Sequence, residues 1–179
     1  MTMPCILAAA SALLLGTGAE AGAMTLTSTT WPDGGRVPAR SAYDQAGCRG
    51  GNISPQVAWH GAPPGTRSYA VTVFDPDAPG GAGWWHWIVL NLPPETPGLP
   101  EGASGGGALP TGAVQARSDW GRARYGGPCP PPGTVHRYVL TIYALDAAQL
   151  PVPRTGAGLD AALRGHILAS ASLAARYGR

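Results

Sequence analysis

The sequence predicts a single, mainly β domain, and three observations support this class. The chain holds 27 glycines and 19 prolines among 179 residues, a composition typical of many tight turns and few long helices. Hydrophobic residues make up 44% of it, which argues against a disordered protein. Apolar runs alternate with turn residues along its length. A chain of this size needs only one domain to bury a core.

Four of the apolar runs are predicted to be strands. Their β-branched and aromatic residues favour extended structure, and prolines such as Pro76 and Pro93 end two of them. Trp59, which lies between turns, is expected to pack in the core. The predicted strands are residues 24–30, 68–75, 84–92 and 136–146.

Residues 93–125 are the least regular part of the chain. Glycines and prolines crowd its centre, and no periodic apolar pattern runs through it. We expect a long surface excursion with at most short strands, and segments of this length in a compact domain are often functional or disordered.

Residues 158–179 are predicted to be helical. Leu159, Leu163 and Ile167 follow a helical spacing, which suits packing against a sheet. Gly165 predicts a break between two short helices.

The N-terminus predicts an export signal. Residues 6–16 are apolar and small residues follow, as in a secretory signal peptide, although the start is poor in positive charge. A buried helix is the alternative, because the run is shorter than the roughly 20 residues that span a bilayer. An A-x-A site favours cleavage after Ala23 over cleavage after Ala21. We therefore expect a signal peptide at 1–23, a mature domain at 24–179 without a transmembrane segment, and a periplasmic or secreted location.

The cysteines suggest one disulfide. Cys5 leaves with the signal peptide, so Cys48 and Cys129 remain. In an oxidising compartment they can pair, which would restrict the unfolded chain by about 4 kcal/mol for a loop of about 80 residues. Two separately buried thiols are the alternative.

The charge balance does not favour nucleic acid as a partner. Lys and Arg number 12, all of them arginine, against 10 acidic residues. The arginines are scattered along the chain and form no basic run.

Two acidic residues and a histidine stand at neighbouring strand ends. Asp75 and Asp77 follow the strand predicted at 68–75, and His86 opens the next one after a short Gly-rich link. If the two strands are neighbours, Asp75 approaches His86, raises the pKa of the imidazole and orients its proton. The simpler alternatives are an Asx-type turn for the acids and a satisfied core position for the histidine. Some rings of the segment 84–87 are candidates for an apolar pocket wall.

The loop 126–138 suggests an anion site. Gly126 and Gly127 allow close backbone approach, and the prolines stiffen the loop, so its free amides are expected to point at a ligand. His136 and Tyr138 then share one face of the following strand, with Leu140 and Ile142, because side chains alternate along a strand. A stiff turn before a strand is the alternative.

These motifs, in this order and spacing, resemble the phosphatidylethanolamine-binding protein family, in its bacterial Raf-kinase-inhibitor-like branch. They are DPDAP at 75–79, the His86 strand, and GGPCPPPGTVHRY at 126–138, and residues 50–59 and 165–169 resemble further family blocks. The resemblance covers essentially the whole mature chain. It implies a large central β-sheet, a smaller second sheet, C-terminal helices, and a pocket that binds phosphate-like groups, including phospholipid head groups.

The resemblance also implies which residues form the pocket. The ligand aspartate falls on Asp75, and Tyr177 corresponds to a C-terminal aromatic that lines the pocket in some members. No cofactor and no metal are implied. The ligand-binding residues carried over are Asp75, Asp77, Pro79, His86, Gly127, Pro128, His136 and Tyr138.

Three functions compete. The leading one is an exported module that binds a small phosphorylated or carboxylated anion. The alternative is a protein-interaction inhibitor of a kinase or protease, acting through the pocket rim with residues 93–125 as the contact. An enzyme or metal protein is third: histidines and aspartates suit acid-base chemistry and zinc, but their spacing matches no metal signature. We expect no enzyme, because Ser54 and Ser118 lack an activating motif.

Overall fold

Two antiparallel β-sheets and one short α-helix make up the regular structure of the described residues. The computed structural model describes residues 23–106 and 108–179, so the predicted signal peptide lies almost entirely outside the described residues. The large sheet has strand order β6-β4-β3-β7-β8 and the small sheet β1-β2-β5. In the large sheet the strands are β3 (Ser68–Asp75), β4 (Trp84–Leu92), β6 (Val114–Gln115), β7 (Val135–Leu145) and β8 (Ile167–Gly178). The remaining elements are β1 (Thr25–Thr27), η1 (Ala39–Ser41), β2 (Val57–His60), β5 (Gly98–Leu99), η2 (Gly156–Gly158) and α1 (Leu159–Leu163).

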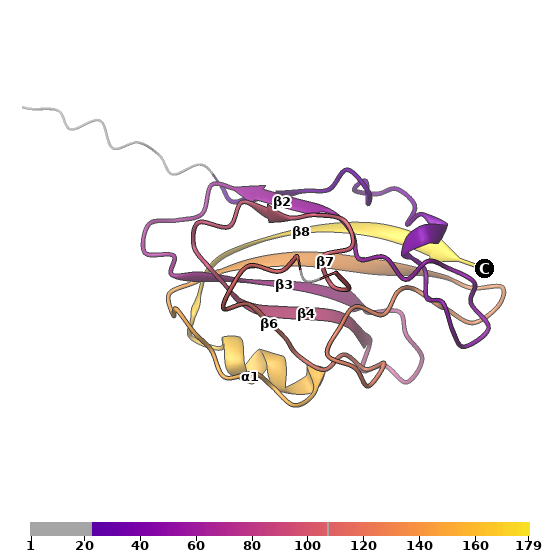
Figure 1. Cartoon of the computed structure of the whole chain (residues 1–179). Helices are drawn as coiled ribbons and strands as arrows, with labels where there is room; N and C mark the ends of the chain where they lie inside the picture. The colour runs from indigo at the N-terminus through magenta and orange to yellow at the C-terminus, as the bar shows by residue number, and fades with distance from the viewer. Residues whose placement is uncertain (1–22, 107) are drawn as a thin grey trace, which may run out of the picture.

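The large sheet is buried on both faces, which explains why its central strands read as continuous apolar runs. Figure 1 shows the small sheet on one side of it and α1 on the other. The face toward the small sheet carries Val71, Val73 and Leu140, packed with residues such as Val57 of β2. The opposite face belongs to a second cluster, which includes the leucines of α1. The mainly β fold with a large and a small sheet is therefore confirmed.

The predicted strands and the irregular segment are largely as expected. Strands β3 and β4 have exactly the predicted bounds, β7 begins and ends one residue earlier, and β1 is shorter. Trp59 is in the core, 5% exposed. In the described part of residues 93–125 the regular elements are the two-residue strands β5 and β6. The segment is not wholly superficial, however, because Tyr125 within it is 2% exposed.

The C-terminal helix prediction is wrong beyond residue 163. Helix α1 covers only Leu159–Leu163, Gly165 turns the chain at φ +80°, and β8 follows as a strand of 12 residues. This strand pairs along the whole of β7, from His136 opposite Tyr177 to Leu145 opposite Ile167. Pairing with a neighbouring strand outweighs the helix propensity of its alanines and leucines.

No helix in the described part of the chain is long and apolar enough to cross a lipid bilayer.

Candidate functional site

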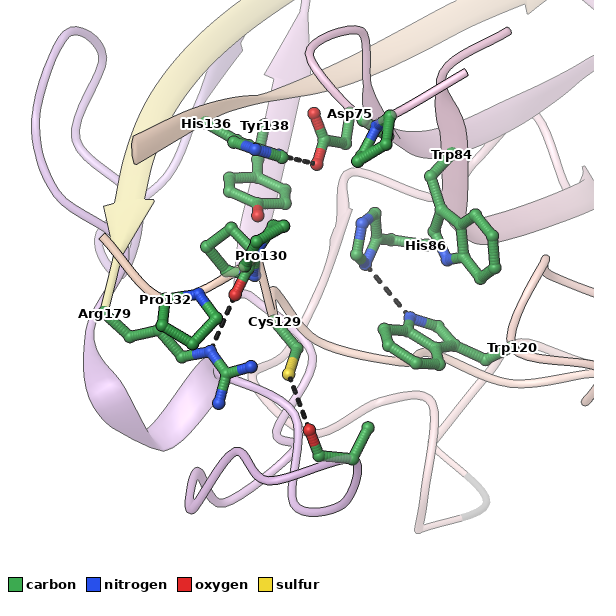
Figure 2. Close-up of a pocket in the computed structure, with 14 residues that line it drawn as sticks. Asp75, Trp84, His86, Trp120, Cys129, Pro130, Pro132, His136, Tyr138 and Arg179 are labelled. Atoms are coloured by element: carbon green, nitrogen blue, oxygen red, sulfur yellow. Dashed lines mark hydrogen bonds and ion pairs between the residues drawn. The ribbon is translucent and has the colours of Figure 1, made fainter. Parts of the chain in front are cut away.

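A cavity of about 420 Å³ opens at one end of the large sheet. The end of β3 and the beginnings of β4 and β7 meet there, because β3 runs antiparallel to both neighbours. We call it the strand-end cavity (Figure 2). Its lining residues are Ala46, Asp75, Ala78, Pro79, Trp84, His86, Trp120, Cys129, Pro130, Pro131, Pro132, His136, Tyr138 and Arg179.

Asp75 hydrogen-bonds His136, and its negative charge also acts on His86 across the cavity. The Nδ1 of His136 lies 2.8 Å from Oδ2 of Asp75, and both side chains are buried. The register of β3 with β7 places Phe74 opposite Val139, so the end of β3 adjoins the start of β7. A carboxylate only accepts hydrogen bonds, so His136 carries its proton on Nδ1 and turns Nε2 away from Asp75.

Asp75 also keeps the turn after β3 in place. Its Oδ1 accepts a hydrogen bond from the amide of Asp77 at 2.8 Å. This is the local carboxylate-to-amide bond that the Asx-type alternative requires. Asp75 therefore serves the turn with one oxygen and orients His136 with the other.

His86 is held by the loop that follows Tyr125. Its Nδ1 lies 2.6 Å from the carbonyl oxygen of Gly126, so Nδ1 must carry the proton that it donates. The indole N–H of Trp120 donates to the same carbonyl at 3.1 Å. His86 is 2% exposed, and its Nε2 makes no hydrogen bond within the described residues.

Burial gives His86 a neutral ring near pH 7. Loss of hydration lowers the pKa of His86 to about 4 and outweighs the Gly126 hydrogen bond and the attraction of Asp75, which both raise it. Asp75 acts on this histidine in the expected direction, but burial has the larger effect, so the net pKa of His86 is lowered rather than raised. In the neutral ring Nδ1 donates and Nε2 accepts.

Tyr138 occupies the centre of the cavity wall. Its ring is fully buried and meets the His86 ring edge-on, with centroids 5.1 Å apart. The hydroxyl oxygen is buried and has no hydrogen-bond partner in the described residues. Burial, with the nearby charge of Asp75, raises the pKa of Tyr138 well above its usual value, so the hydroxyl keeps its proton.

Asp77 faces away from the strand-end cavity. Its Oδ2 accepts the backbone N–H of Arg137 at 2.8 Å, and its two oxygens receive the Arg137 guanidinium at 2.6 to 3.2 Å. These hydrogen bonds lower the pKa of Asp77 to about 2. Asp77 thus fastens the turn after β3 to the start of β7, while Pro79 from the same turn lines the cavity.

The backbone amides of Gly126 and Gly127 do not point into the cavity, contrary to expectation. The Gly126 N–H donates to the carbonyl of His86 at 2.9 Å, and the Gly127 N–H donates to Oδ1 of Asn52 at 2.8 Å. Gly127 and Pro128 lie outside the cavity lining. The carbonyl of Pro128 instead accepts the N–H of Tyr43 at 3.0 Å. The loop reaches the cavity through its next four residues, 129–132.

The predicted disulfide is present. Cys48 and Cys129 are joined by a 2.03 Å S–S bond across a separation of 81 residues. Because Cys129 lines the cavity, the bond ties the cavity wall to the loop around residue 48. Residues 47–55 and 126–138 therefore form one structural unit.

Among the lining residues that were not found from the sequence are a tryptophan and an arginine, Trp120 and Arg179. Trp120 comes from the irregular segment 93–125 and stacks on Tyr43, with ring centroids 3.9 Å apart. Arg179 follows β8, and its guanidinium donates to the carbonyls of Pro130 at 2.7 Å and Gly47 at 3.0 Å. No spacing in the sequence indicates either residue. Tyr177, a candidate by resemblance, lines a different cavity.

Figure 2 shows how the lining side chains are arranged. His136, Tyr138 and Arg179 lie on one side of the cavity, and His86, Trp84 and Trp120 lie on the other. Within the described residues, no group of three or more His, Cys, Asp or Glu side chains is placed to hold a metal ion. The arrangement is a mostly apolar cavity with a few polar atoms facing one another, the usual design of a small-molecule site.

Comparison with known proteins gives consistent matches. The sequence profile described as "Phosphatidylethanolamine-binding protein" matches residues 27–178. The Escherichia coli protein YbhB is 45% identical over 157 residues, which cover 86% of this chain and 99% of YbhB. The crystal structure of E. coli YbcL superposes with a TM-score of 0.84 at 42% identity and covers 87% of this chain and 98% of that one. A Mycobacterium tuberculosis relative, LppC, 38% identical over 74% of this chain and 61% of its own length, carries the word lipoprotein in its name.

Proposed function

Because this chain belongs to the phosphatidylethanolamine-binding protein family, we propose that its strand-end cavity binds a small phosphorylated or carboxylated anion. A free phosphate group and a phospholipid head group share the required chemistry. The proposed role is that of an exported binding protein rather than an enzyme.

The observation that carries this proposal is the set of unbonded polar atoms in the cavity. The hydroxyl of Tyr138 is buried without a partner in the described residues, and a buried polar group of this kind costs about 1 to 3 kcal/mol. The Nε2 atoms of His86 and His136 also make no hydrogen bond within the described residues, while each Nδ1 is fixed by a partner. A ligand that bonds these three atoms would recover that cost.

Charge at the rim supports an anionic ligand. Arg179 lines the cavity, and its Nε and one terminal nitrogen are used by backbone carbonyls. The guanidinium is therefore held in place with donors to spare. Asp75 is the acidic residue in the lining, and both of its carboxylate oxygens already accept hydrogen bonds, one from His136 and one from the amide of Asp77.

The cavity chemistry favours binding over catalysis. Cys129 lines the cavity, but its sulfur is bonded to Cys48 in the disulfide and is therefore not a free nucleophile. Ser54 and Ser118 lie outside the lining, and their hydroxyls are engaged by Ser104 and Arg122.

Export is part of the same proposal. A disulfide persists in oxidising compartments, which agrees with a location outside the cytoplasm, and the name of LppC points the same way. N-terminal sequencing of the protein recovered from the periplasm or the medium is expected to begin at residue 24. A chain that still begins at Met1 would contradict export without affecting the pocket.

Calorimetric titration with inorganic phosphate and with phosphoethanolamine tests the binding function. The double variant His86→Asn with His136→Asn should lose at least tenfold in affinity, because both cavity-facing ring nitrogens disappear. The matched control, His60→Asn with His166→Asn, changes two histidines outside the cavity lining and should bind as the wild type does. Absence of binding heat with both anions, or equal affinity in both double variants, would refute the proposal.

A further inference from the structure

We propose that the strand-end cavity binds an oxyanion together with a proton, which the anion either carries itself or obtains from solvent through His86. The cavity would then prefer inorganic phosphate, which keeps a P–OH group near neutral pH, to sulfate and phosphate diesters, which carry none. This inference rests on the proposed anion-binding function.

The tautomer of His86 is the first step. The carbonyl oxygen of Gly126, 2.6 Å from Nδ1, can only accept, so the proton of a neutral His86 lies on Nδ1. The indole N–H of Trp120 lies 3.1 Å from the same carbonyl and 3.3 Å from Nδ1 itself, and the Gly126 carbonyl, which is much closer to Nδ1 and can only accept, decides the assignment. The Nε2 of His86 therefore meets a ligand as a hydrogen-bond acceptor.

The surroundings of His86 keep its ring neutral in the absence of a ligand. The ring is packed among Tyr138, at 5.1 Å between centroids, and Trp120, at 6.0 Å. Burial lowers the pKa of His86 to about 4. Four other titratable or charged groups line the cavity beside His86: Asp75 on β3, His136 and Tyr138 on β7, and Arg179 after β8. The charge of Asp119, in the loop after β6, also acts on His86.

His136 follows the same geometry. Asp75 accepts its Nδ1 proton at 2.8 Å, which leaves Nε2 without a hydrogen-bond partner in the described residues. Tyr138 contributes a hydroxyl that can donate. An oxyanion without hydrogen would place a lone pair against the Nε2 lone pair of His86, and desolvation makes such an unpaired contact costly.

A proton at the contact removes this conflict. Hydrogen phosphate carries a P–OH group that can donate to Nε2 of His86, while its other oxygens accept from Tyr138 and Arg179. Sulfate and a phosphate diester carry no proton near neutral pH. Their binding requires that His86 first take a proton from solvent, so that Nε2 becomes a donor.

The pH dependence of selectivity tests the inference. Phosphate and sulfate affinities are measured by calorimetry on the wild-type protein at several values between pH 5 and pH 7.5. The ratio of phosphate to sulfate affinity should rise about tenfold per pH unit, because sulfate alone needs His86 protonated. Sulfate binding in buffers of different ionisation heat should show uptake of about one proton.

A variant assigns the effect to one side chain. In His86→Asn the side-chain amide can still donate to Gly126 but cannot take a proton, so the ratio should lose its dependence on pH. His166→Asn, far from the cavity lining, should keep the wild-type slope. A constant ratio in the wild-type protein, or sulfate that fails to bind at pH 5, would overturn the inference while phosphate binding stands. Failure to bind phosphate at any pH would instead overturn the proposed function on which it rests.

Discussion

Replacement of His86 by asparagine should remove much of the acid sensitivity of this protein. In the folded state burial holds the pKa of His86 at about 4, whereas the unfolded side chain has its ordinary value of 6.5. Between these values the unfolded state binds more protons than the folded state, so stability is present above pH 6.5 and falls as the pH drops toward 4. At about 1.4 kcal/mol per pH unit, the full interval amounts to about 3 kcal/mol.

Urea denaturation at steps between pH 4 and pH 7.5, in buffers free of phosphate and sulfate, measures this loss. His86→Asn should be less stable than the wild type near neutral pH, because it leaves a cavity, yet its free energy of unfolding should depend less on pH by about 3 kcal/mol over the interval. His60→Asn, at an exposed position outside the strand-end cavity, should keep the wild-type slope. Parallel curves for the wild type and His86→Asn would show that His86 is not a buried neutral histidine, and the reasoning would fail.

Two further changes test the support of the cavity. The double variant Cys48→Ala with Cys129→Ala should lose about 4 kcal/mol of unfolding free energy, because the disulfide closes a long loop. Chemical reduction should destabilise the wild type and leave this variant unaffected. An equal response of the two proteins to reduction would contradict the prediction. In Gly127→Ala the new Cβ would collide with the backbone carbonyl of Ser41, at a cost of about 3 kcal/mol in thermal or chemical unfolding. Gly105→Ala, whose nearest neighbouring atom would lie 3.9 Å away, is the matched control and should unfold nearly as the wild type does.

The strands that form the cavity could be predicted because their signals are local. Residues 68–75 and 84–92 are rich in β-branched and aromatic residues and end at prolines, and burial on both faces made them continuous apolar runs. The alternation after residue 135 also placed His136 and Tyr138 on one buried face. Local sequence thus located five cavity-lining residues, Asp75, Pro79, His86, His136 and Tyr138.

The last strand was mistaken for a helix although a signal for it was present. From Ala169 to Tyr177 the odd positions are apolar and at least half-buried, while Ser170, Ser172 and Arg176 point outward. This is a period of two, as a strand requires. Alanine and leucine at these positions also favour a helix, and only the presence of β7 as a partner decides between the two structures.

The hydrogen-bond partners within the site could not be predicted from the sequence. Asp75 bonds a histidine 61 residues away, and Gly127 bonds Asn52, 75 residues away. Such partners depend on strand register and loop packing, which neither composition nor spacing encodes. Trp120 and Arg179 reach the cavity for the same reason, from an irregular segment and from the end of the chain.

The packing of Trp120 beside His86 gives the cavity its own optical reporter. Trp84 and Trp120 are two of the six tryptophans and line the cavity, and the Trp120 ring lies 6.0 Å from the His86 ring. A protonated imidazole quenches the emission of a neighbouring indole much more strongly than a neutral one does. Intrinsic fluorescence should therefore report the charge of a single buried histidine, and proton-coupled ligand binding can be followed without any label.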